Sequence, residues 1–252
     1  MDERMKKAIE LFSEDDFDGA LEIFEEYLQQ DPKNAGILNN IGTSYFKKGD
    51  LEKAVEYYMK GIYADPKVKQ LYKNLADVYI ESNDMMSAIG VLQDAVAFMP
   101  DENYLRFALA QVYIMDSRLD IAIDELDKVL ELDHDDLAAR YELARLYFEL
   151  GVYGSAIENY ELVLEKITDN ADLFFNTGCA YEASGDVDKA MSNFLKAVNV
   201  NETYYPAYKK LGLCFMARGE NQDAKEYFED YLQFDLPEEE KESITRVIER
   251  LN

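Results

Sequence analysis

Apolar and polar positions alternate along the chain in short stretches that recur at a fixed interval. The stretch IGTSYFKKGD at residues 41–50 returns as LADVYIESND 34 residues later and as LARLYFELGV at residues 143–152. Apolar side chains in each copy recur three and four residues apart, which is the spacing of one face of an α-helix. The same interval holds from residue 1 to residue 238 without an insertion or deletion, so the pattern predicts seven helical units of 34 residues each.

Each unit carries small residues at two fixed positions, counting residues 1, 35, 69 and so on as position 1. Position 8 is alanine or glycine in every unit, and position 20 is alanine in every unit. A large residue follows each of them: in unit two, Tyr45 follows Gly42 and Tyr58 follows Ala54. Such alternation lets two short antiparallel helices approach closely, so each unit is predicted to be a helical hairpin.

The turn within each hairpin is predicted at position 15. Apart from Ser117, its residues are of types that tolerate the left-handed conformation of a helix C-terminal cap: Asp15, Gly49, Asn83, Gly151, Gly185 and Gly219. Where the next residue is aspartate, it is predicted to cap the N-terminus of the second helix, at Asp16, Asp50, Asp84 and Asp186.

Proline predicts where the second helix ends in the early units. A proline disfavours helical geometry in the residue before it, so these helices should end near Asp31, Asp65 and Met99. Later units carry His134, Thr168 and Glu202 in the proline position, which predicts a softer helix end.

The last residues of the chain also have a helical pattern. Between residues 238 and 252, four apolar side chains share one face and charged side chains occupy the other: the apolar residues are Ile244, Val247, Ile248 and Leu251. A stack of repeats leaves its last apolar face bare, so this helix is predicted to cover it.

The segment LNNIGTSYFKKGDLEKAVEYYMKGIYADP at residues 38–66 resembles the tetratricopeptide repeat, whose pattern has an aromatic residue, Leu-Gly, Tyr, Ala, Phe and Pro at these spacings. The resemblance implies an all-α fold, a right-handed α-solenoid of antiparallel helix pairs. It implies one domain over residues 1–238, followed by a capping helix at residues 239–252. The seven units are residues 1–34, 35–68, 69–102, 103–136, 137–170, 171–204 and 205–238. The sequence departs from the family pattern at position 4, the usual tryptophan column, where Leu38, Arg106 and Arg140 stand.

Charge narrows the choice of partners. The chain has 52 acidic and 26 basic residues and a net charge of -26, so its field repels nucleic acid and anionic membrane surfaces. No apolar run approaches the length of about 18 residues that a spanning helix needs, and the start of the chain lacks the uncharged apolar core of a signal peptide. We therefore expect a cytoplasmic protein without a nucleic-acid or membrane partner.

Catalytic chemistry lacks the residues that it needs. Gly42 and Gly49 have no following Lys-Ser/Thr, so they do not form a phosphate-binding loop. The only histidine, His134, is predicted in an inter-unit loop, where we interpret it as a solvated residue rather than a base or a ligand. Cys179 and Cys214 lack metal-ligand spacing, and we interpret them as reduced structural thiols. We predict no enzymatic activity, no metal and no cofactor.

The resemblance also implies where a partner would bind. In similar proteins the first helices line a concave groove, into which side chains at positions 2, 5, 6, 9, 12 and 13 point. Carried over by position, the predicted partner-binding residues are Asn40, Thr43, Lys47, Lys73, Asn74, Tyr104, Phe107, Gln111, Tyr141, Arg145, Phe148, Phe175 and Asn176.

The predicted groove residues have distinct roles. Asparagine at position 6 would hold the backbone of an extended peptide, because an amide both donates and accepts hydrogen bonds. The aromatic side chains would supply apolar contacts to the partner, and Arg145 would pair with one of its acids. The alternative is that Tyr104, Phe107, Tyr141 and Phe175 only seal contacts between successive first helices.

These observations favour a non-catalytic scaffold or adaptor that binds a peptide, tail or helix of another protein. Some family members clamp a C-terminal carboxylate with Lys and Asn four residues apart, but here Asp77 follows Lys73 and Leu213 follows Lys209. Every unit except unit two is acidic, which favours a basic or apolar ligand over an acidic one. The alternative hypothesis is a homo-oligomeric scaffold formed by self-association.

Overall fold

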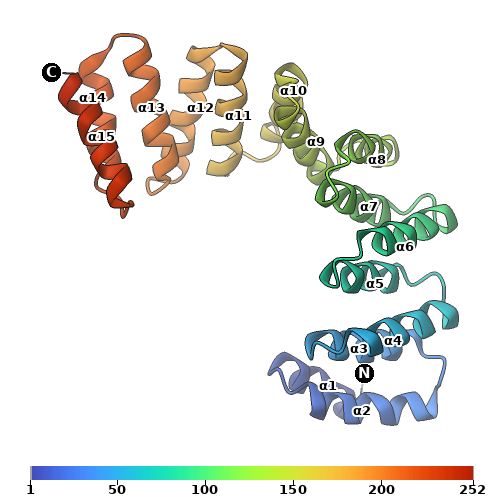
Figure 1. The fold of residues 1–252 in the computed structure, drawn as a ribbon. Coiled ribbons are helices and arrows are strands. Elements are labelled where there is room, and N and C mark those ends of the chain that lie inside the picture. The colour runs from blue at the N-terminus through green and yellow to red at the C-terminus, as the bar shows by residue number, and fades with distance from the viewer. Residues whose placement is uncertain (1, 252) are drawn as a thin grey trace. The chain divides into compact units, whose positions relative to one another are not determined.

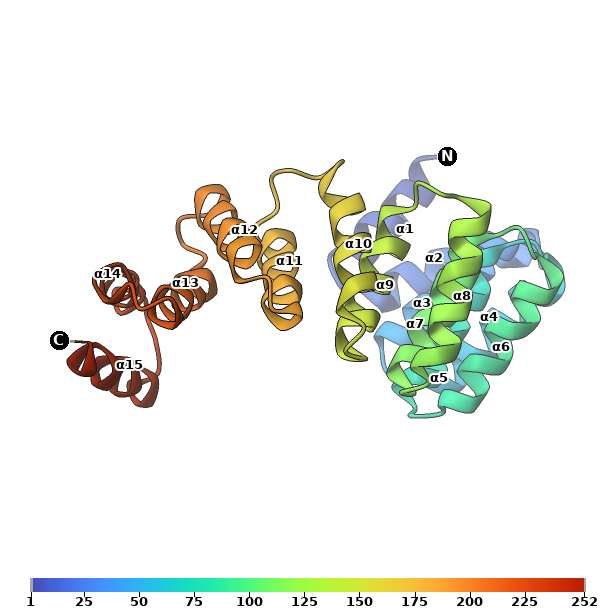
Figure 2. The same cartoon turned by 90° about the horizontal axis from the view of Figure 1, so that it is seen from above.

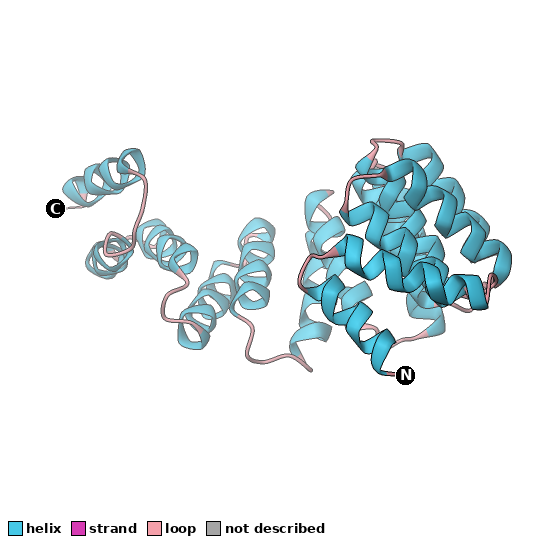
Figure 3. Ribbon diagram, turned by 90° about the horizontal axis from the view of Figure 1, so that it is seen from below, coloured by secondary structure: helices cyan, strands magenta, loops and turns pink. Residues whose placement is uncertain are grey.

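The computed structural model describes residues 2–251, and the regular structure in this range is entirely helical (Figures 1 and 3). Each of the first fourteen helices belongs to one hairpin, in chain order. The helices are α1 (Glu3–Ser13), α2 (Phe17–Gln30), α3 (Ala35–Lys47), α4 (Leu51–Ala64), α5 (Lys69–Glu81), α6 (Met85–Phe98), α7 (Asn103–Met115), α8 (Leu119–Leu132), α9 (Leu137–Glu149), α10 (Tyr153–Leu164), α11 (Ala171–Ser184), α12 (Val187–Val200), α13 (Tyr205–Ala217), α14 (Asn221–Tyr231) and α15 (Glu238–Arg250).

The chain forms two compact units, which we call the N-terminal unit (residues 1–135) and the C-terminal unit (residues 136–252). Within each unit every helix packs against the next one along the chain, which is the arrangement of an α-solenoid. In the N-terminal unit α3, α5 and α7 lie on one side of the stack and α4, α6 and α8 on the other (Figure 2). The all-helical solenoid is confirmed, whereas the single continuous domain stays a prediction.

The small residues lie where the two helices of a hairpin touch. Position 20 alanines, such as Ala54, have no exposed surface in any of the seven units. Gly42 is also buried, and a Cβ added to it would lie 2.7 Å from the ring of Tyr58. Gly178 meets Phe194 in the same way, at 2.6 Å. The predicted contact between small and large columns is therefore the core of each hairpin.

The predicted turns and N-caps are confirmed. All seven position 15 residues have positive φ, from 58° at Ser117 to 90° at Gly185. Ser117 adopts this conformation although it has a Cβ, because its backbone N–H must bond the carbonyl of Ile114 to close the helix. The carboxylate of Asp50 accepts from the backbone N–H of Lys53 at 3.1 Å, and Asp16, Asp84 and Asp186 cap their helices in the same way.

The prediction that second helices end more softly in the later units is wrong for units four and six. Helices α8 and α12 end at position 30, as α2 and α4 do, although no proline follows. In units four and six the side chains of Asp133 and Asn201 accept a hydrogen bond from the backbone N–H two residues ahead, at 3.1 and 3.0 Å. Asp31 and Asp65 make the same bond in the units with proline. This Asx turn therefore suffices to end the helix.

Unit five has neither proline nor an Asx residue at this place. Its second helix, α10, ends two positions early at Leu164, and Ile167 stands where the other units, apart from unit three with Met99, have aspartate or asparagine. The segment of residues 165–170 is consequently longer than the corresponding loops. It has six residues, whereas the connection between α12 and α13 has four.

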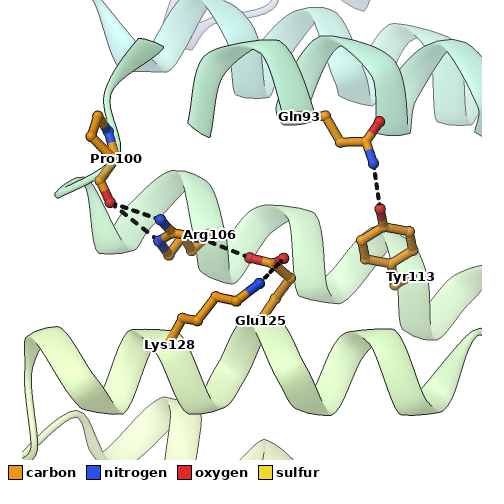
Figure 4. A network of polar contacts seen from close by, with 6 residues as sticks. All are labelled: Gln93, Pro100, Arg106, Tyr113, Glu125 and Lys128. Atoms are coloured by element: carbon orange, nitrogen blue, oxygen red, sulfur yellow. Dashed lines mark hydrogen bonds and ion pairs between the residues drawn. The ribbon is translucent and has the colours of Figure 1, made fainter. Parts of the chain in front are cut away.

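In units three, four and seven the position 4 side chain fastens the first helix to the loop before it. Tyr72 donates from its hydroxyl to the carbonyl of Pro66 at 3.0 Å, and Tyr208 donates to the carbonyl of Glu202 at 3.0 Å. Arg106 donates to the carbonyl of Pro100 through Nε at 3.2 Å and Nη2 at 3.1 Å (Figure 4). In all three cases the acceptor lies six residues earlier, so one position serves the same task with two residue types.

Arg106 has a second partner that explains how a guanidinium replaces an aromatic ring. Its Nη1 lies 3.1 Å from a carboxylate oxygen of Glu125 on α8, and both side chains are largely buried, with 15 % and 12 % exposed (Figure 4). Lys128 donates to the other oxygen of Glu125 at 2.8 Å. The buried charge is thus both paired and hydrogen-bonded, which is the condition for tolerating it.

Helix α15 covers the apolar end of α14. Ile244 is buried there against the cluster of Phe228, Tyr231 and Leu236. Glu240 accepts hydrogen bonds from Lys209 Nζ at 2.6 Å and from the Tyr231 hydroxyl at 2.7 Å. These two bonds lower the pKa of the Glu240 carboxyl below its usual range.

We expect Gly42→Ala to destabilise the protein by about 1 to 3 kcal/mol, because the new methyl group overlaps a ring that is almost fully buried. Gly90→Ala is the matched control, since nothing lies within 4 Å of an added Cβ at this helical position. The control should stabilise α6 by about 0.5 to 1 kcal/mol. Urea unfolding of both variants measures the difference, and equal effects would contradict the packing role of Gly42.

Burial raises the pKa of Tyr58 to about 12, above the ordinary value near 10. The folded chain therefore holds this proton more tightly than the unfolded chain. The contribution is fully present below about pH 10 and is lost as the pH rises toward about 12. We expect the midpoint of thermal unfolding, followed by circular dichroism, to fall less steeply over this range in Tyr58→Phe than in the unchanged protein. An equal fall of the midpoint with pH in both proteins would contradict a contribution from the raised pKa of Tyr58.

Candidate partner-binding site

The first helices of the N-terminal unit are joined by a row of side-chain hydrogen bonds, which we call the polar ladder: Asn39, Gln70, Asn74 and Tyr104. Asn74 donates to Oδ1 of Asn39 at 2.9 Å and accepts from the amide of Gln70 at 2.8 Å. The hydroxyl of Tyr104 donates to Oε1 of Gln70 at 2.9 Å. The ladder crosses from α3 to α5 and from α5 to α7, so it ties three successive repeats together.

Five more predicted residues of this unit lie on the same helices but have different surroundings. Thr43 accepts from the Tyr58 hydroxyl at 3.0 Å, and Lys73 pairs with Asp77 at 2.6 Å. Phe107 is half-buried, while Lys47 and Gln111 are exposed.

Asn40 differs from its counterpart Asn74 in the same column. Its side chain is half-buried and makes no hydrogen bond to any residue in the described range. The structure thus engages one predicted asparagine of this unit and leaves the other open to an outside partner.

In the C-terminal unit the structure brings Tyr141 and Asn176 together. The Asn176 amide donates to the Tyr141 hydroxyl at 2.9 Å across α9 and α11. The residue separation of 35 is the same as between Asn74 and Asn39, so position 6 again bonds position 5 of the preceding repeat. The ring of Tyr141 meets the ring of Tyr160 edge to face, with centroids 5.8 Å apart.

A cleft of about 490 Å³ opens beside this pair, and we call it the α9–α11 cleft. Its walls are mainly apolar and come from α9, the end of α10, the irregular segment of residues 165–170, and α11. The lining residues are Leu137, Ala138, Tyr141, Val163, Ile167, Asn170, Asp172, Leu173 and Asn176. The early end of α10 at Leu164 lies between two of these lining residues, Val163 and Ile167.

Asp172 gives the cleft an acidic rim. The side chain is exposed and accepts a hydrogen bond from the Tyr204 hydroxyl at 2.8 Å. Burial, followed by this bond to Asp172, raises the pKa of Tyr204 well above its usual range, so the phenol stays protonated and keeps donating. An apolar recess beside a carboxylate suits an apolar side chain with a positive charge next to it.

The other predicted residues of this unit are held by neighbours within the chain. The ring of Phe175 packs between Phe194 and Tyr204, with centroids 5.6 and 5.5 Å away. Phe148 packs on Tyr153 at 5.7 Å. For Phe175 and Phe148, ring packing within the chain is therefore an observed role.

Arg145 is also engaged, although on the surface. Its guanidinium pairs with Glu142 on the same helix at 2.8 Å, and 45 % of its side chain is exposed. An exposed pair of this kind contributes little to stability, so a ligand acid can replace Glu142 at small cost.

The thiols show no sign of activation. Burial raises the pKa of Cys179 to about 11, and the pKa of Cys214 is raised for the same reason. The thiol form, which is a poor nucleophile, therefore dominates near neutral pH.

Within residues 2–251, no three His, Cys, Asp or Glu side chains gather closely enough to hold a metal ion. In the same range every helix is too short or too polar to cross a membrane.

Comparison with known families decides what kind of repeat this is. Models described as tetratricopeptide repeat match residues 11–77, 171–204 and 207–233. The chain is a tetratricopeptide repeat protein. A model described as anaphase-promoting complex, cyclosome, subunit 3 matches the intervening residues 81–163. No curated protein sequence matches the chain.

Solved tetratricopeptide repeat structures resemble the chain over most of its length. A protein from Parabacteroides merdae is 20 % identical with a TM-score of 0.62, covering 99 % of this chain and 97 % of that one. The C-terminal part of a repeat protein from Cytophaga hutchinsonii is 16 % identical with a TM-score of 0.75, covering 92 % and 95 %. YrrB, described as a TPR protein with an unusual peptide-binding site, is 21 % identical with a TM-score of 0.59, covering 73 % and 95 %. At these identities the likeness concerns the fold.

The list of predicted partner-binding residues lacks several residues that build these faces, among them Asn39, Gln70, Ile167, Asp172 and Tyr204. Gln70 and Asp172 stand at position 2 of the tetratricopeptide repeat, a column that the resemblance names. Ile167 could have been found from its column, position 31. Units one, two, four and six have aspartate or asparagine there, and unit three has Met99. Tyr204 lies outside the first-helix columns, and no sequence signal points to it.

We expect Asn74→Ala to lower the free energy of unfolding by about 1 to 2 kcal/mol, because it removes two ladder hydrogen bonds. Asn40→Ala, in the same column, loses no side-chain hydrogen bond within the described range and should change stability by less than about 0.5 kcal/mol. Urea titration compares them. A larger loss for Asn40→Ala than for Asn74→Ala would refute the structural role assigned to the ladder.

Proposed function

We propose that this tetratricopeptide repeat protein is a non-catalytic adaptor that binds a segment of another protein on its first helices. The observation that carries the proposal is the α9–α11 cleft. Its mainly apolar lining, the hydrogen-bonded Tyr141–Asn176 pair and the carboxylate of Asp172 together fit a side chain from a partner. YrrB shows that a protein of this fold can have a peptide-binding site.

The ligand that fits best is an apolar residue next to a basic one. The apolar side chain would enter between Leu137 and Ile167, and the basic group would lie near Asp172 at the rim. The chain carries twice as many acids as bases, so a basic segment is also attracted from a distance. Asn176 can offer its remaining amide hydrogen and its carbonyl to the backbone of the segment.

The N-terminal unit contributes a more polar surface to the same function. The ladder commits Asn74 and Tyr104 to bonds between repeats, whereas Asn40, Lys47 and Gln111 remain available. We assign peptide contact in this unit to these three residues. In this unit Asn40 alone would then bond the backbone of the peptide, because the side chain of Asn74 is already bonded within the ladder.

We expect Ala138→Trp to abolish partner capture, because Ala138 is exposed at the wall of the cleft and an indole would fill it. Ala97→Trp places the same indole on an exposed position of α6 and serves as the control. Tagged forms of the full chain are incubated with lysate of the source organism, and captured proteins are compared by mass spectrometry. The same partners retained by both variants would exclude the cleft as the binding site.

Self-association is the competing function, and it is tested without a partner. Light scattering over a range of protein concentrations gives the molar mass directly. A constant monomer mass excludes a homo-oligomeric scaffold, whereas a rising mass that returns to the monomer in Ala138→Trp would mean that a second copy occupies the cleft.

A further inference from the structure

Position 4 has a second consequence in unit two, where it is leucine. Tyr72, Arg106 and Tyr208 each reach back to a carbonyl six residues earlier, but Leu38 has no donor with which to do so. It is also smaller than the arginine, tyrosine or phenylalanine side chains at position 4 of the other units. Leu38 is 2 % exposed, so its own atoms are packed, and the space that a longer side chain would fill lies beyond them.

That space is a cleft of about 590 Å³ on the outer side of the hairpin, which we call the Leu38 cleft. It is bounded by Pro32 and Lys33 of the inter-repeat loop and by α4, and its lining is almost entirely apolar. The lining residues are Pro32, Lys33, Leu38, Glu56, Met59, Lys60, Tyr63 and Ala64. The cleft lies wholly within the N-terminal unit and shares no residue with the polar ladder.

A second cleft lies beside the position 4 residue of unit six, which also lacks a hydrogen-bond donor. Phe174 occupies position 4 of unit six and, like leucine, cannot donate a hydrogen bond. A cleft of about 520 Å³ opens beside it, lined by Thr168 at the proline position and by polar residues such as Lys189 and Lys196. Loss of the position 4 donor thus accompanies a recess in both units, but only the Leu38 cleft is apolar.

Two large apolar side chains stand exposed at the mouth of the Leu38 cleft. Met59 is 55 % exposed and Tyr63 is 87 % exposed. The Tyr63 hydroxyl has no hydrogen-bond partner in the described part of the chain. Exposed apolar side chains around an apolar recess are typical of a surface that another protein covers.

Charge at the rim selects the partner. Lys60 pairs with Glu56 at 2.5 Å, which leaves Lys33 as a rim cation with no ion pair in the described range. Pro32 and Lys33 belong to the loop at the end of unit one, and the rest of the lining belongs to unit two, the one unit that is not acidic, with five lysines against four acids. The rim is therefore electrostatically suited to a carboxylate, in contrast to the α9–α11 cleft with Asp172.

We propose that the Leu38 cleft is a second docking surface, separate from the first-helix face, which takes an apolar side chain of a partner protein with an acidic residue beside it. The apolar side chain occupies the space beyond Leu38, against Met59 and Tyr63. The acidic residue pairs with Lys33. This surface and the α9–α11 cleft then select segments of opposite charge, so the protein can hold two different partners.

The chain itself supplies a variant that closes the cleft without disturbing the fold. Tyrosine at position 4 is accommodated in units three and seven, where its hydroxyl donates to the loop carbonyl at 3.0 Å. Leu38→Tyr should therefore fill the cleft and donate to the carbonyl of Pro32. Its thermal midpoint should equal or exceed that of the unchanged protein, so loss of binding would not reflect unfolding.

The test uses the full chain and a phage-displayed library of random dodecapeptides. The library is first depleted on immobilised Leu38→Tyr and then selected on the unchanged protein. We expect the recovered peptides to carry a large apolar residue within one turn of Asp or Glu. Labelled copies, measured by fluorescence polarisation, should bind Leu38→Tyr and Lys33→Glu about tenfold or more weakly, which corresponds to about 1.4 kcal/mol.

Three results would overturn the proposal. The first is that no peptide survives depletion on Leu38→Tyr, and the second is that the recovered peptides are basic or bind Lys33→Glu unchanged. The third is a dimer in sedimentation that Leu38→Tyr converts to a monomer, since a second copy would then be the occupant. Ala138→Trp should bind the recovered peptides normally. The test of the Leu38 cleft is therefore independent of whether the α9–α11 cleft binds a partner.

Discussion

The close contact between a small residue on the first helix and a ring or leucine on the second underlies the whole structure. Gly42 and Tyr58 show it most plainly, because no side chain larger than hydrogen fits between the backbone and the ring. Once this distance is set, the turn between the helices must reverse the chain within a few residues. The left-handed residue at position 15 and the capping aspartate after it meet that requirement. Hairpins built in this way are alike enough to stack, and stacking then creates the surfaces on which function depends.

Features that depend on one hairpin were predictable from sequence, because the residues involved are close along the chain. Asp50 lies three residues before the N–H that it caps, and Gly49 stands next to it. The error over helix ends arose from weighing proline alone, although Asp133 and Asn201 carry an equally local signal. Ser117 shows the reverse case, in which the geometry of the turn overrides the preference of the residue type.

Features that depend on stacking were only partly predictable. The asparagine column was visible in the sequence, but the partner of each asparagine lies 35 residues away, and nothing local says whether the amide faces a neighbouring repeat or solvent. Asn40 and Asn74 share a column and differ in this respect. The clefts were harder still to predict, since each lies beside a departure from the common repeat: α10 ends early at one, and Leu38 is small at the other. A repeated column of residues predicts a contact directly, whereas a cleft depends on how several neighbouring side chains fill space together.

The position 4 side chain takes no part in the contact between the small and large columns that joins the two helices of a hairpin. It contacts the loop before its helix, while the small and large columns that join the hairpin lie elsewhere, so leucine, tyrosine and arginine all occur there without a change in helix pairing. A single substitution can therefore open or close a recess on one repeat and leave its neighbours untouched. In a gene made of tandem copies, this allows each copy to acquire its own surface after duplication, which gives a repetitive protein a simple route to unlike binding sites.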